Sequence, residues 1–246
     1  MNEILCVTNL SKSYKGEKVV DEISFEVKKG EIIGFLGPNG AGKSTTINMI
    51  STITDKDSGN IAYNGINVDK NINTFKKALG VVPQELAFFN DMTAYDNVKF
   101  FASLYGLKGT NLLTAVEDAL ISVGLWDRRK KYPKTFSGGM KRRLNIACSI
   151  VYKPEILIMD EPTVGIDPQS RNLIMETIDS LNAQGTTVIY VSHYMEEVQR
   201  LCKRVLIMDK GRILDAGENE ALLKKYDCDT LEDMFLKITG KSMRDN

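Results

Sequence analysis

The residues GPNGAGKST, at positions 37–45, decide the fold of this chain. They follow the apolar run at residues 32–36 and precede a helical pattern at residues 44–53, so that a strand enters a glycine-rich loop that opens a helix. Glycines let backbone N–H groups close around an anion, and the helix N-terminus adds positive potential. The stretch therefore predicts a phosphate-binding loop in an α/β protein.

The polar side chains of this loop have distinct expected roles. Lys43 is expected to reach the β- and γ-phosphates, Ser44 to ligate Mg²⁺ and Thr45 to bind the α-phosphate. The main chain expected around the phosphates belongs to Asn39, Gly40, Ala41 and Gly42. An ordinary glycine-rich turn is the alternative, and the flanking strand and helix disfavour it.

The composition limits the classes of function. The 246 residues suffice for one large α/β domain with a subdomain. Lys and Arg number 32, as do Asp and Glu, so the global charge indicates neither a nucleic-acid partner nor an acidic substrate. The N-terminus lacks the pattern of a signal peptide, and no apolar run approaches the ~20 residues that span a bilayer. We therefore expect a chain without a membrane span of its own.

Residues 128–143 break this charge balance, because they hold eight basic residues and no acidic one. A solvated face is the usual explanation of such a run. The alternative is that the run raises the positive potential around a nearby phosphate-binding surface. The basic residues are Arg128, Arg129, Lys130, Lys131, Lys134, Lys141, Arg142 and Arg143.

Hydrophobic periodicity predicts the remaining elements. Strands are expected at both ends of residues 3–28 and at 59–68, 80–82, 156–159, 187–191 and 205–208. Helices are expected at 75–79, 94–105, 111–123, 138–151 and 168–184. Residues 86–153 then form a helical insertion in an α/β core, and a charged helical tail occupies about 218–246.

A second chemical feature is the run ILIMDE at residues 156–161. An apolar strand without alternation indicates a strand covered on both faces, and this one ends in Asp160 and Glu161. Asp160 is suited to hold Mg²⁺ through water, and Glu161 to orient or deprotonate the attacking water. Acids flanking a turn are the alternative, but together with a phosphate loop they indicate hydrolysis of a nucleoside triphosphate.

His193 is the single histidine of the chain and directly follows a predicted core strand and Ser192. Ligands of open α/β sheets bind at such strand ends. A neutral imidazole there would contact the γ-phosphate or tie the attacking water to Glu161. A structural histidine is the alternative.

The run FSGGM at residues 136–140 predicts a second phosphate-binding surface. Ser137 caps a helix, and with Gly138 and Gly139 it leaves N–H groups and the positive helix end facing outward. One triphosphate rarely needs two such surfaces in one chain. A head-to-tail dimer does need them, because each copy then covers the γ-phosphate of the other.

Together these motifs resemble the nucleotide-binding subunit of an ATP-binding cassette (ABC) transporter. The phosphate loop corresponds to Walker A, ILIMDE to Walker B, FSGGM to the LSGGQ signature and VGID (residues 164–167) to the D-loop. Gln84 matches the Q-loop glutamine, which contacts Mg²⁺ and senses the membrane partner, and His193 matches the switch histidine. Tyr14 falls where the family stacks an aromatic ring on adenine, with Val19 as an apolar neighbour.

Met140 departs from the pattern, because the family has a signature glutamine at this position. A polar contact to the nucleotide of the partner copy is therefore in doubt there, whereas Ser137 and both glycines are in place. The runs SGGMKRRL, VGIDP and LEDMFLKITGK resemble the ATPases of ABC-2-type exporters.

The resemblance implies an α/β fold with a P-loop NTPase (RecA-like) core, an antiparallel β subdomain and an inserted α-helical signature subdomain. It implies ATP and Mg²⁺ as cofactors, a transmembrane permease as partner, and a homodimer or a heterodimer with a paralogous cassette. It places the chain in the cytoplasm, peripheral on the cytoplasmic face of the cell membrane. The implied catalytic residues are Lys43, Glu161 and His193; the metal ligands are Ser44, Gln84 and Asp160; and Ser137, Gly138, Gly139 and Asp167 contact the nucleotide of the partner copy.

Three other functions are weighed against this one. A soluble ABC ATPase acting on nucleic acid or ribosomes usually has tandem cassettes, a coiled-coil insertion or a basic extension, and the sequence shows none of these. The chain has no N-K-x-D guanine motif. Neither a GTPase nor a nucleotide kinase would explain FSGGM or His193. A non-hydrolysing module is disfavoured because Glu161 and His193 are both present.

Overall fold

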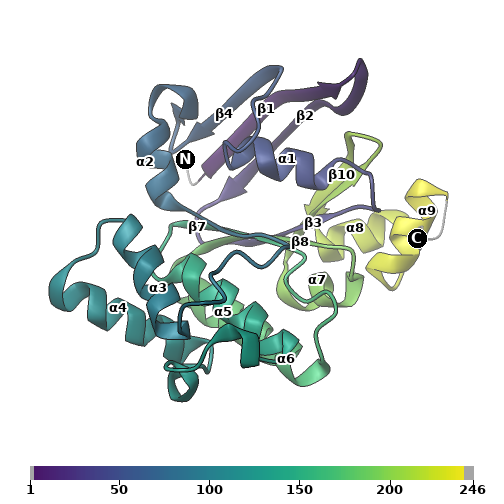
Figure 1. Ribbon diagram of the computed structural model, residues 1–246. Helices are drawn as coiled ribbons and strands as arrows, with labels where there is room; N and C mark the ends of the chain where they lie inside the picture. The colour runs from purple at the N-terminus through teal and green to yellow at the C-terminus, as the bar shows by residue number, and fades with distance from the viewer. Residues whose placement is uncertain (1–2, 241–246) are drawn as a thin grey trace. The chain divides into compact units, whose positions relative to one another are not determined.

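The computed structural model describes residues 3–240, which form two compact units. The first unit contains the chain up to Lys76 and again from Thr187 onward, and the second contains Lys77–Thr186. Figure 1 shows the course of the chain through the elements of both. The last six residues of the predicted helical tail, 241–246, lie outside the described residues.

The first unit contains an antiparallel sheet built from the N-terminal part of the chain. A tight turn at Lys15 and Gly16, which both have positive φ, joins its two long strands. The strands, in spatial order, are β2 (Glu17–Lys28), β1 (Glu3–Tyr14), β4 (Ser58–Tyr63) and β5 (Ile66–Asn67).

The first unit also contains the strands that carry the phosphate loop. Strand β3 is parallel to β8 and β9 and lies between them, while β10 is antiparallel to β9. Strands β3 and β8 are apolar and largely buried, as expected when helices cover both faces. The bounds are β3 (Ile32–Leu36), β8 (Thr187–Ser192), β9 (Arg204–Asp209) and β10 (Arg212–Glu218).

The helices of the first unit include two that the sequence analysis did not separate and one that it missed. The C-terminal tail forms two helices, not one, because the chain turns at Asp227, which has a left-handed backbone. The missed helix, α7, follows β8 directly. The helices are α1 (Lys43–Ile50), α7 (Met195–Leu201), α8 (Asn219–Tyr226) and α9 (Leu231–Thr239), with the 3₁₀ turn η1 (Val68–Lys70). Strand β10 was also not predicted.

The second unit pairs two parallel strands with a group of helices. Helices α3, α4 and α5 contact one another, and α5 also contacts α6 and β6 (Figure 1). The strands are β6 (Leu79–Val82) and β7 (Ile156–Asp160). Helix α2 (Ile72–Ala78) precedes β6 and belongs to the first unit up to Lys76. The helices are α3 (Ala94–Leu104), α4 (Gly109–Ser122), α5 (Gly138–Ile150) and α6 (Pro168–Ala183), with 3₁₀ turns η2 (Trp126–Arg128) and η3 (Pro133–Thr135).

Side-chain caps fix where these helices begin. The Thr93 hydroxyl accepts a hydrogen bond from the Asp96 N–H (3.1 Å), which confirms the predicted start of α3. The Asp167 carboxylate accepts one from the Ser170 N–H (2.9 Å) at the start of α6. Among residues 3–240, no helix combines the length and the apolar composition needed to cross a bilayer.

Candidate functional site

The phosphate loop connects β3 to α1 in the first unit. Gly40 and Gly42 have φ values of 78° and 104°, which side chains with a Cβ rarely adopt, so these glycines permit the tight course of the loop. Lys43 is 6% exposed, and its Nζ donates to the carbonyls of Gly37 (2.6 Å) and Pro38 (3.1 Å). These two bonds hold the ammonium charge against the loop. Asn39 and Ser44 are exposed, and Thr45 is half-buried.

Gly37 shows how closely the loop packs on the strand beside it. A Cβ at Gly37 would collide with the backbone carbonyl oxygen of Met208 in β9. Overpacking typically costs about 1–3 kcal/mol, so the Gly37→Ala variant is expected to melt several degrees below wild type. Differential scanning calorimetry measures the shift. The control is Gly138→Ala, since a Cβ there meets nothing within 4 Å, and equal melting temperatures for both variants would contradict the predicted packing.

The pairing of β3 with β8 brings His193 to the strand edge that carries the phosphate loop. Leu36 is in register with Ser192, so Gly37 and His193 follow neighbouring parallel strands. The Ser192 hydroxyl accepts a hydrogen bond from the Tyr194 N–H (2.9 Å) and fixes the turn around the half-buried histidine. The first unit thus gathers the phosphate loop and His193, as the sequence predicts for the ends of core strands.

The two residues predicted near adenine also lie in the first unit. Tyr14 ends β1 and is 46% exposed, with Lys12 Nζ 5.6 Å from its ring centroid. Val19 is half-buried, and its carbonyl oxygen lies 2.6 Å from where a Cβ at Gly42 would be. The main chain at Val19 therefore directly adjoins the phosphate loop, and Gly42 is required by this close approach as well as by its φ.

In the second unit, β6 and β7 bring the predicted Q-loop and Walker B residues together. Val82 is in register with Met159, so Gln84 and Asp160–Glu161 follow the carboxyl ends of neighbouring parallel strands. Gln84 is exposed and Asp160 is half-buried. Glu161 is 8% exposed and has a φ of 48°. A left-handed glutamate costs of order 1 kcal/mol or more, and such strain concentrates at functional sites.

The signature residues lie at the start of α5. The Ser137 hydroxyl accepts a hydrogen bond from the Met140 N–H (3.2 Å), which confirms the predicted cap. Ser137 and Gly138 are exposed, whereas Gly139 is buried. Met140, which takes the place of the signature glutamine, is half-buried.

The D-loop aspartate lies next to the signature in the same unit. A Cβ at Gly139 would lie 3.1 Å from a carboxylate oxygen of Asp167 and would collide with the Ser170 side chain. Hydrogen bonds from Ser170 hold the pKa of Asp167 below its usual value, which keeps this exposed carboxylate charged. Burial lowers the pKa of Arg143, and the negative charge of Asp167 partly offsets this decrease.

Three polar residues of α5, namely Arg142, Asn145 and Ser149, are buried. The sequence analysis gave no role to Asn145 and Ser149, and the solvated face weighed for the basic run is wrong for Arg142. They hydrogen-bond to the main chain of β6 and of the segment after it. The signal was present, because the three positions are spaced three and four residues apart and so share one helix face.

The predicted site residues therefore form two groups, each within one unit. The first unit holds Tyr14, Val19, the phosphate loop with Asn39, Gly40, Ala41, Gly42, Lys43, Ser44 and Thr45, and His193. The second holds Gln84, Ser137, Gly138, Gly139, Asp160, Glu161 and Asp167.

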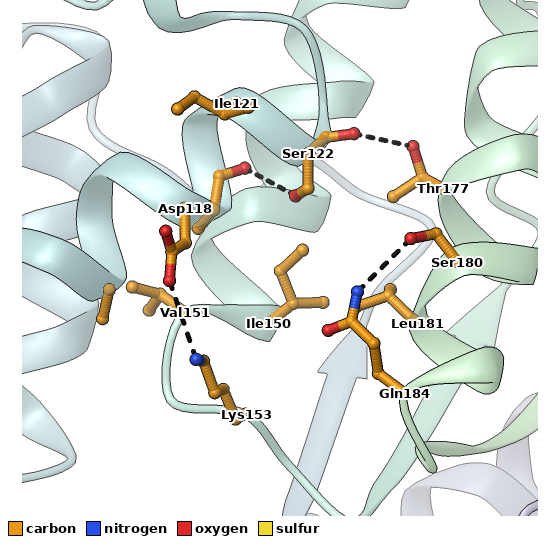
Figure 2. A pocket seen from close by; sticks show the side chains of 12 residues that line it. Asp118, Ile121, Ser122, Ile150, Val151, Lys153, Thr177, Ser180, Leu181 and Gln184 are labelled. Carbon is orange, nitrogen blue, oxygen red and sulfur yellow. Dashed lines mark hydrogen bonds and ion pairs between the residues drawn. The ribbon is translucent and has the colours of Figure 1, made fainter.

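A separate pocket of about 320 Å³ lies in the second unit among α4, α5 and α6. Figure 2 shows its rim, with the Asp118–Lys153 ion pair (3.6 Å) on one side and the Gln184–Ser180 hydrogen bond (3.3 Å) on the other. The Thr177 hydroxyl donates to the Ser122 carbonyl (3.2 Å) and links α6 to the end of α4. None of the predicted site residues lines this pocket.

A family model described as ABC transporter matches residues 20–164, which include the phosphate loop, Gln84, the signature and the Walker B strand. The chain belongs to the ABC transporter family. ABC ATP-binding domains bind ATP and hydrolyse it, so the activity of this chain is that of an ATPase.

Individual members of the ABC family resemble the chain over nearly its whole length. The linearmycin resistance ATP-binding protein LnrL of Bacillus subtilis (strain 168) is 49% identical over 96% of this chain and 76% of its own. The Nod factor export ATP-binding protein I of Ralstonia nicotianae is 37% identical over 93% of this chain and 72% of its own. The solved structure of an ATP-binding subunit of an ABC transporter superposes with a TM-score of 0.88 at 26% identity, covering 96% of this chain and 99% of that one. The predicted P-loop NTPase fold is confirmed.

Proposed function

We propose that this ABC protein is the ATP-hydrolysing subunit of an exporter and acts on a separate membrane permease. The main structural support for the proposed site is the register of β6 and β7, because it brings the Gln84 segment beside the Walker B acids. The relatives named for linearmycin resistance and for Nod factor export support export as the direction of transport. They give no support to an ATPase that acts on nucleic acid or ribosomes.

The phosphate loop and its neighbours bind the nucleotide in this proposal. Lys43 binds the β- and γ-phosphates, since its ammonium group is already fixed against the loop carbonyls. Thr45 binds the α-phosphate, and the exposed ring of Tyr14 stacks on adenine, with Val19 beside it. The N–H groups of residues 39–42 complete the contacts to phosphate.

The proposed metal ligands fit Mg²⁺ in their chemistry. Ser44, Gln84 and Asp160 supply a hydroxyl, an amide and a carboxylate oxygen, and Mg²⁺ prefers oxygen ligands together with substrate phosphates and waters. Within residues 3–240, no group of three or more His, Cys, Asp or Glu side chains is arranged to hold a metal. A site with a single carboxylate that relies on phosphates and water agrees with that finding. When bound, Mg²⁺ would neutralise the charge that develops on the phosphate oxygens.

Glu161 and His193 support the hydrolysis step. Glu161 orients the attacking water and accepts its proton, since the residue directly follows the strand that carries Asp160. His193 contacts the γ-phosphate or the same water. Positioning and charge stabilisation supply most of the rate in phosphoryl transfer, so small displacements of either side chain matter.

The exposed start of α5 supports a composite site in a dimer. Ser137 and Gly138 are exposed, and the helix N-terminus behind them is positive. Ser137, Gly138, Gly139 and Asp167 of one copy are proposed to contact the nucleotide held by another copy or by a paralogous cassette. The dimer acts at the cytoplasmic face of the cell membrane, where the exposed apolar side chains of Leu86 and Phe89 offer a surface to the permease.

The Ser137→Arg variant tests this composite site. It is expected to bind ATP as a monomer with wild-type affinity and to lose at least about 90% of its turnover, because a long cationic side chain blocks the exposed helix end. Equilibrium binding of a fluorescent ATP analogue and a phosphate-release assay measure the two properties. The control is Glu117→Arg, which places the same long cation on an exposed position of α4 and should leave turnover unchanged. Full turnover in Ser137→Arg would refute the composite site.

A further inference from the structure

Helix α5 carries a row of polar side chains on the face that meets β6. Arg142, Asn145, Ser149 and, just past the helix end, Tyr152 are spaced by three or four residues and therefore share one face. We refer to these four residues as the polar ladder. Each donates a hydrogen bond to a main-chain carbonyl of β6 or of the segment after it: Tyr152 to Leu79 (3.2 Å), Ser149 to Val81 (2.7 Å), Arg142 to Pro83 (3.0 Å), and Asn145 to Pro83 (3.3 Å) and Glu85 (3.4 Å).

Gln84 lies inside the stretch that the polar ladder holds. The polar ladder binds the carbonyls on both sides of Gln84 and also one N–H group. The Asn145 Oδ1 accepts a hydrogen bond from the Ala87 N–H (2.9 Å). The amide of Asn145 is 1% exposed and so bridges residues 83, 85 and 87 in a buried position. The Gln84 side chain itself is exposed. The backbone at Gln84 is fixed while its side chain remains available to a ligand.

Arg142 holds the first residue after β6. Its buried guanidinium donates a hydrogen bond to the Pro83 carbonyl (3.0 Å), directly before Gln84. The register of β6 and β7 already places Pro83 and Asp160 at neighbouring strand ends. Arg142 therefore fixes the end of β6 beside the strand that carries Asp160.

We propose that Arg142 and Asn145 are positioning residues that hold the segment of the proposed Mg²⁺ ligand Gln84 in place at the strand end beside Asp160. The inference rests on the proposed function of these ligands. Helix α5 begins at the signature, so the same helix joins the surface offered to a second cassette to the Gln84 segment. A purely structural role would require only that buried polar groups be paired; the positioning role also requires that Mg²⁺ recognition change when the pairing is lost.

The Asn145→Ala variant tests the inference with two measurements. Hydrogen exchange at residues 83–89 is expected to rise at least about tenfold, because the Ala87 N–H loses its acceptor. The gain in ATP affinity that Mg²⁺ provides over EDTA is expected to fall about fivefold, with affinity in EDTA unchanged, as for the loss of one or more buried hydrogen bonds. The probe is a fluorescent ATP analogue titrated in both conditions.

Matched variants separate the possible outcomes. Tyr152→Phe removes the hydrogen bond at the far end of the polar ladder and is expected to keep both wild-type values. Arg142→Met is expected to reduce the Mg²⁺ gain, and Arg142→Lys to restore part of it; this pair tests the inference independently of how well Asn145→Ala folds. Gln84→Ala serves as the reference for losing the ligand itself.

Two results would overturn the inference for different reasons. An unchanged Mg²⁺ gain in Asn145→Ala, with the gain lost in Gln84→Ala, would show that Gln84 binds the metal without help from the polar ladder. An unchanged gain in Gln84→Ala would remove the proposed role of Gln84, and the inference would fall with it.

Discussion

The Glu161→Gln variant is expected to bind Mg-ATP and to hydrolyse it at least about 100-fold more slowly than wild type, since a positioned general base typically contributes 10²–10⁴-fold. Glutamine preserves the shape of the side chain, which is 8% exposed at the end of β7, but it cannot accept a proton. The backbone strain at this position stays the same, because neither residue is favoured at positive φ. The loss is therefore expected in turnover rather than in folding or binding.

Slow hydrolysis should also trap the closed dimer. Size exclusion with light scattering is expected to show Glu161→Gln shifting from monomer to dimer with Mg-ATP and remaining monomeric with ADP. The control is Glu155→Gln, which alters an exposed carboxylate just before the same strand and should hydrolyse ATP normally. A variant that hydrolyses normally would disprove the role of Glu161. A monomer that persists in Mg-ATP would leave the ATPase in place and favour pairing with a paralogous cassette.

The Lys43→Ala variant is expected to lose at least about 100-fold in affinity for ATP. Charge-assisted hydrogen bonds are worth roughly 1.5–3 kcal/mol each, and the Lys43 ammonium is proposed to bind two phosphate groups. The substitution also leaves the carbonyls of Gly37 and Pro38 without their lysine donor, so the loop itself should loosen. Both effects act in the same direction.

Equilibrium binding of a fluorescent ATP analogue measures the loss, with a thermal melt to show that the variant is folded. Lys29→Ala removes an exposed lysine in the turn before β3 and should bind ATP as wild type does. Lys43→Arg keeps the charge but not the shape of the ammonium group. Its affinity for ATP should therefore fall between that of wild type and that of Lys43→Ala. Unchanged affinity in Lys43→Ala would show that phosphate binds elsewhere.

The main elements were predictable from sequence because their signals are local. The strand, loop and helix of residues 32–53 and the helix starts at residues 94 and 168 each depend on a few neighbouring residues, and the structure confirms these elements. Strand β10 was missed because its burial alternates between exposed and half-buried positions, so that it lacks a fully apolar face. Helix α7 was missed because it is short and directly follows the turn at His193.

The polar ladder shows what local reasoning could not supply. Asn145 and Ser149 are weak helix formers, and their positions among apolar neighbours carry no sign of the partner they meet. Their hydrogen-bond acceptors lie some 60 residues earlier in the chain, and only the packing of α5 against β6 brings the two together. The assignment of Gln84 came from a resemblance; the way its backbone is held came from the structure.

The polar ladder contacts main-chain atoms alone along the Gln84 segment. Carbonyl and N–H groups are the same in every residue except proline, so the exposed side chains of Glu85, Leu86 and Phe89 can be exchanged without removing any of these contacts. Mutations could therefore change the surface proposed to contact a permease while the main-chain contacts beneath it stay intact. In evolutionary terms, such a segment is free to diversify: a duplicated gene could acquire a new membrane partner by changing a few exposed side chains, with the catalytic geometry inherited unchanged.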